Sequence, residues 1–266
     1  MKLLFVGDVI GKPGRRAVAR LLPRLIDEHH ADYVIVNVEN AAGGFGVTPD
    51  VLAELAELPI HCMTTGNHVW DKKEVGELFD REPRLLRPAN YPEGNPGRGI
   101  HLGETAAGVP VATINLEGMV FMSNLDSPFR TADRLLKELA LKEPKVKVIF
   151  VDFHAEATSE KQAMGFYLDG RVSGVIGTHT HVPTADERVL PNGTALLTDA
   201  GMTGPYESII GMRADKVLRR FLLQTSPPFE VAKRDVRLAG AVLDIDEETG
   251  KARGIERLLL PDPTQQ

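Results

Sequence analysis

The sequence contains almost no cysteine, and this absence sets a first limit on what the protein can be. Cys62 is the single cysteine among 266 residues, so an intrachain disulfide is excluded. Such a chain is typical of a reducing compartment, and we expect a cytoplasmic protein. Cys62 also lies within an apolar strand segment and not at its exposed end, which disfavours a cysteine nucleophile.

Long apolar runs and an excess of positive charge are absent as well. No hydrophobic stretch approaches the roughly 20 residues that span a bilayer. The run after Met1-Lys2 is too short for the hydrophobic core of a signal peptide. The formal net charge of −6 disfavours binding of a long nucleic acid. We therefore expect no membrane association, and a small phosphate-bearing substrate remains compatible with this charge.

A phosphate-binding loop of the Walker type is also missing. Only three residues separate Gly7 from Gly11, and Pro13 stands where the motif requires Ser or Thr. The first apolar strand ends in Asp8 instead. Taken alone, an aspartate at this position is most simply a turn or helix-capping residue.

What the sequence does contain is a series of apolar strand segments that end in metal-ligand residues. The most informative is residues 64–71 (TTGNHVWD), where an apolar run turns into a charged helical pattern. Open α/β sheets bind their ligands at such strand ends. Gly66 allows a sharp turn and a close approach. Asn67 and His68 then supply a metal ligand and a proton donor, and residues 71–74 resemble a capping box for the next helix.

Other strand segments end in the same way. The strand over residues 33–38 delivers Glu39-Asn40, and a buried carboxylate costs desolvation free energy unless it is paired or metal-bound. For Glu39 alone, a surface salt bridge is an equally good interpretation. Later strands deliver His154 and the pair His179 and His181, whose spacing places both imidazoles on one side of an extended backbone. A single histidine is usually a hydrogen-bonded structural group, but the pair weakens that interpretation.

Together these residues favour a metal centre. A parallel-rich sheet would gather the strand ends along one edge. Oxygen and imidazole ligands without thiolate suit Mn, Fe or Zn. Seven or eight such groups exceed the needs of one tetrahedral ion and fit two ions roughly 3.5–4 Å apart, as in displacement at phosphorus. The candidate residues are Asp8, Glu39, Asn40, Asn67, His68, His154, His179 and His181.

The motifs and their order resemble the calcineurin-like metallophosphoesterases. They cover residues 7–181, and the blocks Gly66-Asn67-His68 and Gly177–His181 are similar to the most specific signatures of that superfamily. Two positions depart from its pattern. Ile10 replaces the histidine of the first motif, and Asn37-Val38 precedes Glu39 where the superfamily has Gly-Asp.

The Glu-Asn variant of the second motif resembles the bacterial YmdB-like branch over nearly the whole chain. Asn40 can replace the missing histidine ligand in this variant. That branch cleaves 2′,3′-cyclic nucleotides to 3′-nucleotides, so the resemblance implies a phosphodiesterase acting on small phosphodiesters.

The resemblance also implies a role for each candidate residue. Two divalent or trivalent ions are expected, most simply Fe or Mn, with Zn as an alternative. A hydroxide held between them would attack phosphorus, and His68, outside both ligand sets, would protonate the leaving alkoxide or stabilise the transition state. The first ion would be held by Asp8, Asn40 and His181, the second by Asn67, His154 and His179, and Glu39 would bridge both.

The implied fold is a four-layer α/β/β/α sandwich of two mixed sheets flanked by helices. The alternation of strand and helix patterns over the first two hundred residues agrees with this fold. Two antiparallel strands, residues 236–245 and 255–260, flank a turn at 247–250 and are expected to complete the second sheet. No linker or repeat divides the sequence, so residues 1–266 are predicted to form one domain.

Two other functions use the same residues. A phosphomonoesterase or nucleotidase would need the same two ions, because metals stabilise charge at phosphorus in each case. A regulatory nucleotide-binding protein is less favoured, since binding alone requires no free acid such as His68. Specificity is expected in loops 118–129 and 203–213. The resemblance further suggests a homo-oligomer, with the apolar loop Met119–Phe121 as a candidate contact.

Overall fold

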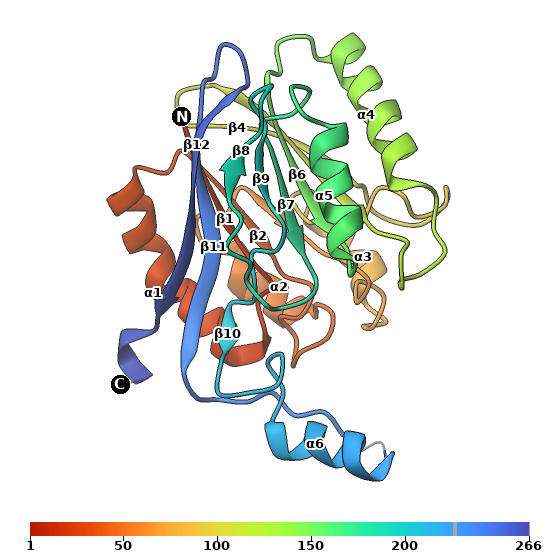
Figure 1. The fold of residues 1–266 in the computed structure, drawn as a ribbon, viewed down its shortest axis with the longest axis vertical. Coiled ribbons are helices and arrows are strands. Elements are labelled where there is room, and N and C mark those ends of the chain that lie inside the picture. The colour runs from red at the N-terminus through yellow and green to blue at the C-terminus, as the bar shows by residue number, and fades with distance from the viewer. Residues whose placement is uncertain (226–227, 266) are drawn as a thin grey trace.

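The computed structural model describes residues 1–225 and 228–265, which form two mixed sheets and their covering helices (Figure 1). The first sheet contains β1 (Lys2–Val6), β2 (Tyr33–Asn37), β3 (Cys62–Thr64), β10 (Gly204–Pro205), β11 (Val236–Ile245) and β12 (Ala252–Pro261). The second contains β4 (Ile100–Glu104), β5 (Pro110–Glu117), β6 (Val148–His154), β7 (Gly174–Thr178), β8 (Arg188–Val189) and β9 (Ala195–Leu197).

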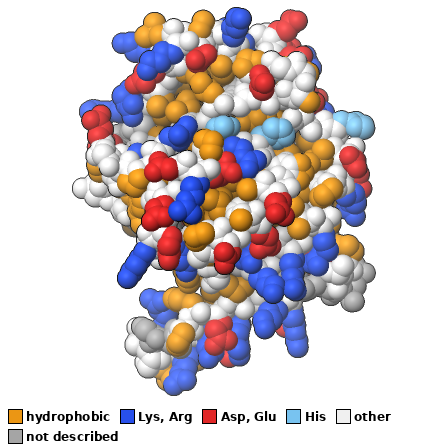
Figure 2. Space-filling model, turned by 180° about the vertical axis from the view of Figure 1, so that it is seen from behind, with side chains coloured by type: hydrophobic (Ala, Val, Ile, Leu, Met, Phe, Trp, Pro, Cys, Tyr) orange, Lys and Arg blue, Asp and Glu red, His pale blue; other side chains and the backbone are white. Residues whose placement is uncertain are grey.

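The helices lie outside the sheets, with α1 on one side and α4 and α5 on the other (Figure 1). Their bounds are α1 (Gly11–His29), α2 (Pro49–Ala56), α3 (Val75–Arg81), α4 (Pro128–Lys142), α5 (Thr158–Tyr167), α6 (Ala214–Leu223) and the 3-10 turn η1 (Pro263–Gln265). Within the described residues, no helix combines the length and the apolar character needed to cross a membrane. Acidic and basic side chains are interspersed over most of the face seen in Figure 2.

Strand β1 shows why the chain forms four layers. Its side chains alternate, as in any strand buried on both faces. Leu4 and Val6 pack in the apolar cluster that includes Val18 and Leu22 of α1. Leu3 and Phe5 pack instead in the cluster between the sheets, where the rings of Phe5 and Phe150 lie 5.1 Å apart.

A third apolar cluster completes the layering. It joins the outer face of the second sheet to α4 and α5 through side chains such as Leu116, Leu135 and Met164. Three cores therefore separate helix, sheet, sheet and helix, and the predicted four-layer α/β/β/α sandwich is confirmed.

The C-terminal hairpin is not where the sequence placed it. We expected this hairpin to complete the second sheet, but β11 pairs antiparallel with β1 in the first sheet, from Lys2↔Asp244 to Val6↔Gly240. The prediction was wrong because β1 pairs with β2 on one side only, and its other edge needs a hydrogen-bonding partner. A Cβ atom at Gly240 would lie 2.1 Å from the Phe5 carbonyl oxygen, so this close pairing requires glycine.

A buried carboxylate connects the two sheets beneath their carboxyl ends. Asp152 on β6 is fully buried. Its Oδ2 accepts hydrogen bonds from Asn37 Nδ2 of β2, at 2.9 Å, and from the Thr64 hydroxyl of β3. Its Oδ1 accepts one from Thr178 Oγ1 of β7 at 2.7 Å. The second sheet thus supplies an acceptor for donors on the first, and the register between the layers is fixed at this point.

Replacement of Asp152 by alanine should therefore destabilise the fold. We expect the free energy of unfolding to fall by roughly 2–4 kcal/mol, because each buried donor left without an acceptor costs about 1–3 kcal/mol. Urea denaturation of metal-free protein measures this change. The control is Asp244→Ala, which removes a half-exposed ion pair with Lys2 and should cost less than about 1 kcal/mol. Equal losses in the two variants would contradict the role given to Asp152.

Candidate metal centre

The predicted ligand residues converge, but from two sheets. Asp8, Glu39, Asn40 and Asn67 follow β1, β2 and β3 of the first sheet. His154 ends β6, and His179 and His181 follow β7 of the second sheet. The expectation of a single sheet edge was wrong, because hydrophobic patterning identifies a strand end without showing which sheet the strand joins.

One cluster contains Asp8, Asn40 and His181. Asn40 Nδ2 lies 3.2 Å from His181 Nε2, and His181 Nε2 lies 4.0 Å from Asp8 Oδ2. Asp8 Oδ1 and Asn40 Oδ1 are buried and have no hydrogen-bond partner among the described residues. Burial raises the pKa of Asp8 well above its usual value, although His154 opposes the rise. A cation at this cluster would satisfy the orphaned oxygens and favour the ionised carboxylate.

A second cluster contains Asn67, His154 and His179. His154 Nε2 lies 2.9 Å from Asn67 Oδ1 and 3.1 Å from His179 Nδ1. Ligand atoms of Glu39, His154 and His179 all lie within 4.8 Å of one another. Two imidazole nitrogens this close to each other and to a carboxylate need a shared proton or a cation between them. The donor set of oxygens and imidazoles fits a metal ion.

Glu39 belongs to both clusters. Its Oε1 accepts a hydrogen bond from Asn40 Nδ2 at 2.8 Å and lies 3.2 Å from His154 Nε2. The carboxylate is buried, which by itself raises its pKa, but the charge and hydrogen bond of His154 lower the pKa to about 2. Glu39 is therefore ionised and is the one predicted residue in contact with ligand atoms of both groups.

Hydrogen bonds behind the rings fix which nitrogen faces the centre. His154 Nδ1 lies 2.9 Å from Thr178 Oγ1, which donates to Asp152 and so must accept from the imidazole. His181 Nδ1 lies 2.9 Å from the carbonyl oxygen of Ile210 and donates to it. Both arrangements direct Nε2 inward, the orientation of metal-binding histidines, and this nitrogen can bind a metal once it carries no proton.

His179 has the opposite tautomer. Its Nε2 lies 3.0 Å from Glu156 Oε2, and its Nδ1 faces His154. Burial and the charge of His154 lower the pKa of His179 to about 3, so this imidazole is neutral. Burial likewise lowers the pKa of His181. Neutral rings are the form that binds metals.

The backbone at the histidine pair differs from the sequence prediction. His179 and His181 have φ values of 99° and 67°, so the segment is left-handed and not extended. Consequently His179 joins the second cluster and His181 the first. The buried Asp199 holds this conformation, since its Oδ2 accepts from the Thr180 amide and hydroxyl and from Lys161 Nζ at 2.6 Å. Sequence reasoning missed Lys161 and Asp199, which lie far apart in the chain.

The segment containing Gly66 also corrects the sequence interpretation. A Cβ atom at Gly66 would lie 2.2 Å from the His154 ring, so glycine is needed for this ring to approach the strand end. Helix α3 begins at Val75, and Asp71 does not cap it. Asp71 Oδ2 instead lies 2.8 Å from His68 Nδ1. The capping-box prediction was wrong because this side chain finds a partner nearer in the turn.

His68 lies beside the two clusters, and among the described residues its ring forms no hydrogen bond or ion pair with a side chain of either. Its amide donates to Glu39 Oε2 at 3.2 Å, and its side chain is 29% exposed. His68, Glu39 and Asn40 line one cavity of about 690 Å³. The ring is therefore accessible to a ligand that reaches the centre.

A further buried acid, Glu117, was missed by the sequence analysis. Glu117, at the end of β5, pairs in register with His154, and its two carboxylate oxygens are buried without a hydrogen-bond partner among the described residues. Burial raises its pKa to about 7. Its position at the end of an apolar strand is the signal that could have identified it.

The hydroxyl behind His154 gives a test of the centre. Thr178→Val keeps the side-chain shape but removes the acceptor for His154 Nδ1, and we expect metal affinity to fall about 10- to 100-fold. The matched control is Thr113→Val, because the Thr113 hydroxyl is buried without a partner among the described residues. Metal titration by calorimetry measures both variants, and an unchanged affinity in Thr178→Val would refute the orientation described for His154.

Metal binding should also release a proton. Burial lowers the pKa of His154, but Glu39 and other acids outweigh this and raise it to about 9 in the metal-free protein. At pH 7 the ring is then protonated, and a metal must displace that proton. Apparent affinity should increase about tenfold per pH unit up to about pH 9. Calorimetry in two buffers of different ionisation enthalpy detects the released proton, and heats that are independent of buffer would contradict the protonated ring.

Comparison with known proteins finds relatives that match nearly the whole chain. The YmdB-like protein family matches residues 4–258. The chain is 49% identical over 262 residues to the 2′,3′-cyclic-nucleotide 2′-phosphodiesterase of Bacillus subtilis strain 168, with 98% of each chain covered.

Two solved structures share the whole fold. A hypothetical protein from Thermus thermophilus has a TM-score of 0.91 at 44% identity, covering 99% of this chain and 100% of that one. A novel phosphatase from Mycoplasma pneumoniae has a TM-score of 0.90 at 34% identity, covering 100% and 95%. With a family match over nearly its entire length and relatives similar from end to end, the chain belongs to the YmdB-like protein family.

Proposed function

We propose that this protein is a metal-dependent phosphodiesterase that hydrolyses 2′,3′-cyclic nucleotides to 3′-nucleotides. The observation that carries the proposal is the pair of ligand clusters joined by Glu39, with His68 beside them in the same cavity. The printed activity of the relative from Bacillus subtilis, 49% identical over 98% of both chains, supports the substrate class.

Two ions are proposed for the centre, in keeping with the two clusters. Asp8, Asn40 and His181 would hold one, Asn67, His154 and His179 the other, and Glu39 would bridge them. Fe or Mn is the proposed metal, with Zn as an alternative, because the donors are carboxylates, amides and imidazoles. When bound, such ions stabilise negative charge on phosphate oxygens and lower the pKa of a nearby water.

The reaction requires one bond to phosphorus to form and one to break. The oxygen of water attaches to phosphorus and releases a proton to solvent, the P–O2′ bond breaks, and O2′ takes up a proton to become the ribose hydroxyl. His68 is positioned to give that proton: its Nδ1 donates to Asp71 Oδ2 at 2.8 Å, which orients the ring and leaves Nε2 free to face the leaving group. Asp71 thus holds the acid in its donating orientation.

His68→Ala should lower turnover of 2′,3′-cyclic AMP about 10²- to 10⁴-fold, the usual contribution of a positioned acid. Metal content should stay near that of the wild type, because the His68 ring contacts neither cluster. Elemental analysis is measured alongside the rates. His29→Ala, which removes a histidine near the exposed Glu256, is the control. Loss of metal in His68→Ala would show that this residue is a ligand.

A phosphomonoesterase is the second candidate, favoured by the similarity to the Mycoplasma phosphatase. Metal-loaded protein, an EDTA-treated sample and His68→Ala should be compared on 2′,3′-cyclic AMP, bis(p-nitrophenyl) phosphate and 5′-AMP. Cleavage of the two diesters with 5′-AMP spared supports the phosphodiesterase. Preference for 5′-AMP would favour a nucleotidase, and no turnover by protein containing two metals would favour a regulatory nucleotide-binding protein.

Cytoplasmic location and a homo-oligomeric state stay predictions. The suggested contact loop Met119–Phe121 is compatible with an interface, since the Phe121 side chain is 89% exposed.

A further inference from the structure

We propose that the apolar half of the active-site cavity is a stacking site for the base of a nucleotide, with Phe229 as its principal ring. The inference rests on the proposed function and names the part of the substrate that decides specificity. One cavity of about 690 Å³ extends from the metal-ligand side chains to this apolar wall. Its volume lies within the roughly 300–1,000 Å³ typical of small-molecule sites. The apolar wall comprises Phe45, Val182, Ile210, Phe221 and Phe229.

The aromatic rings of the wall lie close to one another and to His68. Phe45 and Phe229 have centroids 6.0 Å apart and are inclined by 52°, and the Arg220 guanidinium lies 5.2 Å from the Phe229 centroid. Phe45 also meets the His68 ring edge-on, at 4.9 Å. The aromatic wall therefore begins next to the proposed acid, so one nucleotide could contact both.

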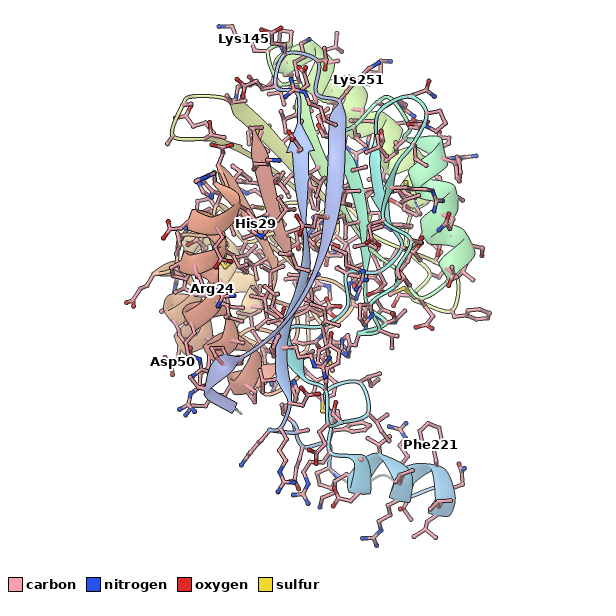
Figure 3. All side chains as sticks on the ribbon, turned by 60° about the vertical axis from the view of Figure 1, so that its left-hand side comes forward. Arg24, His29, Asp50, Lys145, Phe221 and Lys251 are labelled. Carbon is pink, nitrogen blue, oxygen red and sulfur yellow. The ribbon has the colours of Figure 1, made fainter. Side chains whose placement is uncertain are left out.

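Several wall residues expose apolar surface that a ligand would cover. Phe229 is 40% exposed, Ile210 52% and Phe221 70%. Phe221 lies on α6, which projects from the two sheets (Figure 3). Val217 is the one buried residue of α6, so the helix supplies side chains to the cavity rather than to the core. Apolar patches of this kind beside a polar site mark ligand-binding grooves.

The chemistry of the wall favours a nucleobase over other groups. Every base has an aromatic face that stacks on phenylalanine. The Arg220 guanidinium lies over the Phe229 ring, and it can donate hydrogen bonds to base nitrogen or oxygen atoms. A polyol would find few hydrogen-bond partners on this side. The phosphate end of the ligand would meanwhile lie at Glu39, Asn40, His179 and His181, which line the same cavity.

The test compares two substrates with the same five-membered cyclic phosphate, only one of which has a base: 2′,3′-cyclic AMP and glycerol 1,2-cyclic phosphate. Phe229→Leu should lower the ratio of their kcat/KM values roughly 5- to 150-fold, the usual effect of losing one stacked base. Phe229→Tyr should retain the ratio, because it keeps the ring. Phe166→Leu is the matched control, since Phe166 is also exposed beneath an arginine, Arg188, but lies outside the cavity.

A binding measurement separates this inference from the proposed function. Calorimetry of metal-loaded protein with 3′-AMP and with glycerol 3-phosphate reports stacking whether or not either cyclic ester is cleaved. If the wild type cleaves neither cyclic ester, the proposed function is overturned and the stacking site is not. A Phe229→Leu variant that keeps the wild-type substrate ratio and the wild-type preference for 3′-AMP would overturn the stacking site, with the phosphodiesterase unaffected.

Discussion

The carboxylate of Asp152 is the interaction on which both the fold and the site depend. It accepts from Asn37 and Thr64 on the first sheet and from Thr178 on its own sheet, so it fixes the two layers against each other. The same Thr178 hydroxyl accepts from His154 Nδ1 and thereby directs Nε2 of that ring toward the centre. A buried carboxylate is unfavourable unless it is fully hydrogen-bonded. Here one of the hydrogen bonds that stabilise Asp152, the one from Thr178, also positions His154.

The centre contains more buried polar atoms than the described residues can hydrogen-bond. Asp8 and Asn40 each have a side-chain oxygen without a partner among the described residues. In the absence of a cation, the carboxylate of Glu39 is balanced by the charged ring of His154. Metal-free protein therefore relies on the protonated ring of His154, whose pKa is about 9. Cations would remove this electrostatic strain, so metal binding and the local packing of the two sheets are coupled.

Much of the site could be predicted because its residues follow strands. Asp8, Glu39-Asn40, Asn67 and His154 each lie at or shortly after the end of an apolar strand, and parallel strands direct their carboxyl ends to one side. The supporting residues could not be identified in this way. Asp199 and Lys161 act on the histidine segment from elsewhere in the chain, and Glu156 and Asp71 resemble ordinary surface acids until their histidine partners are known.

Local patterns and motif spacing were sufficient to predict the order of the main strands and helices, the ligand chemistry and the resemblance to a family. Tertiary structure decided that the ligands come from two sheets, that the C-terminal hairpin covers the free edge of β1, and that His179 and His181 diverge on a left-handed backbone. It also brought Phe45 and Phe229 together beside His68. Each of these outcomes depends on hydrogen bonds and packing between residues far apart in the chain, and a local sequence pattern does not predict such contacts.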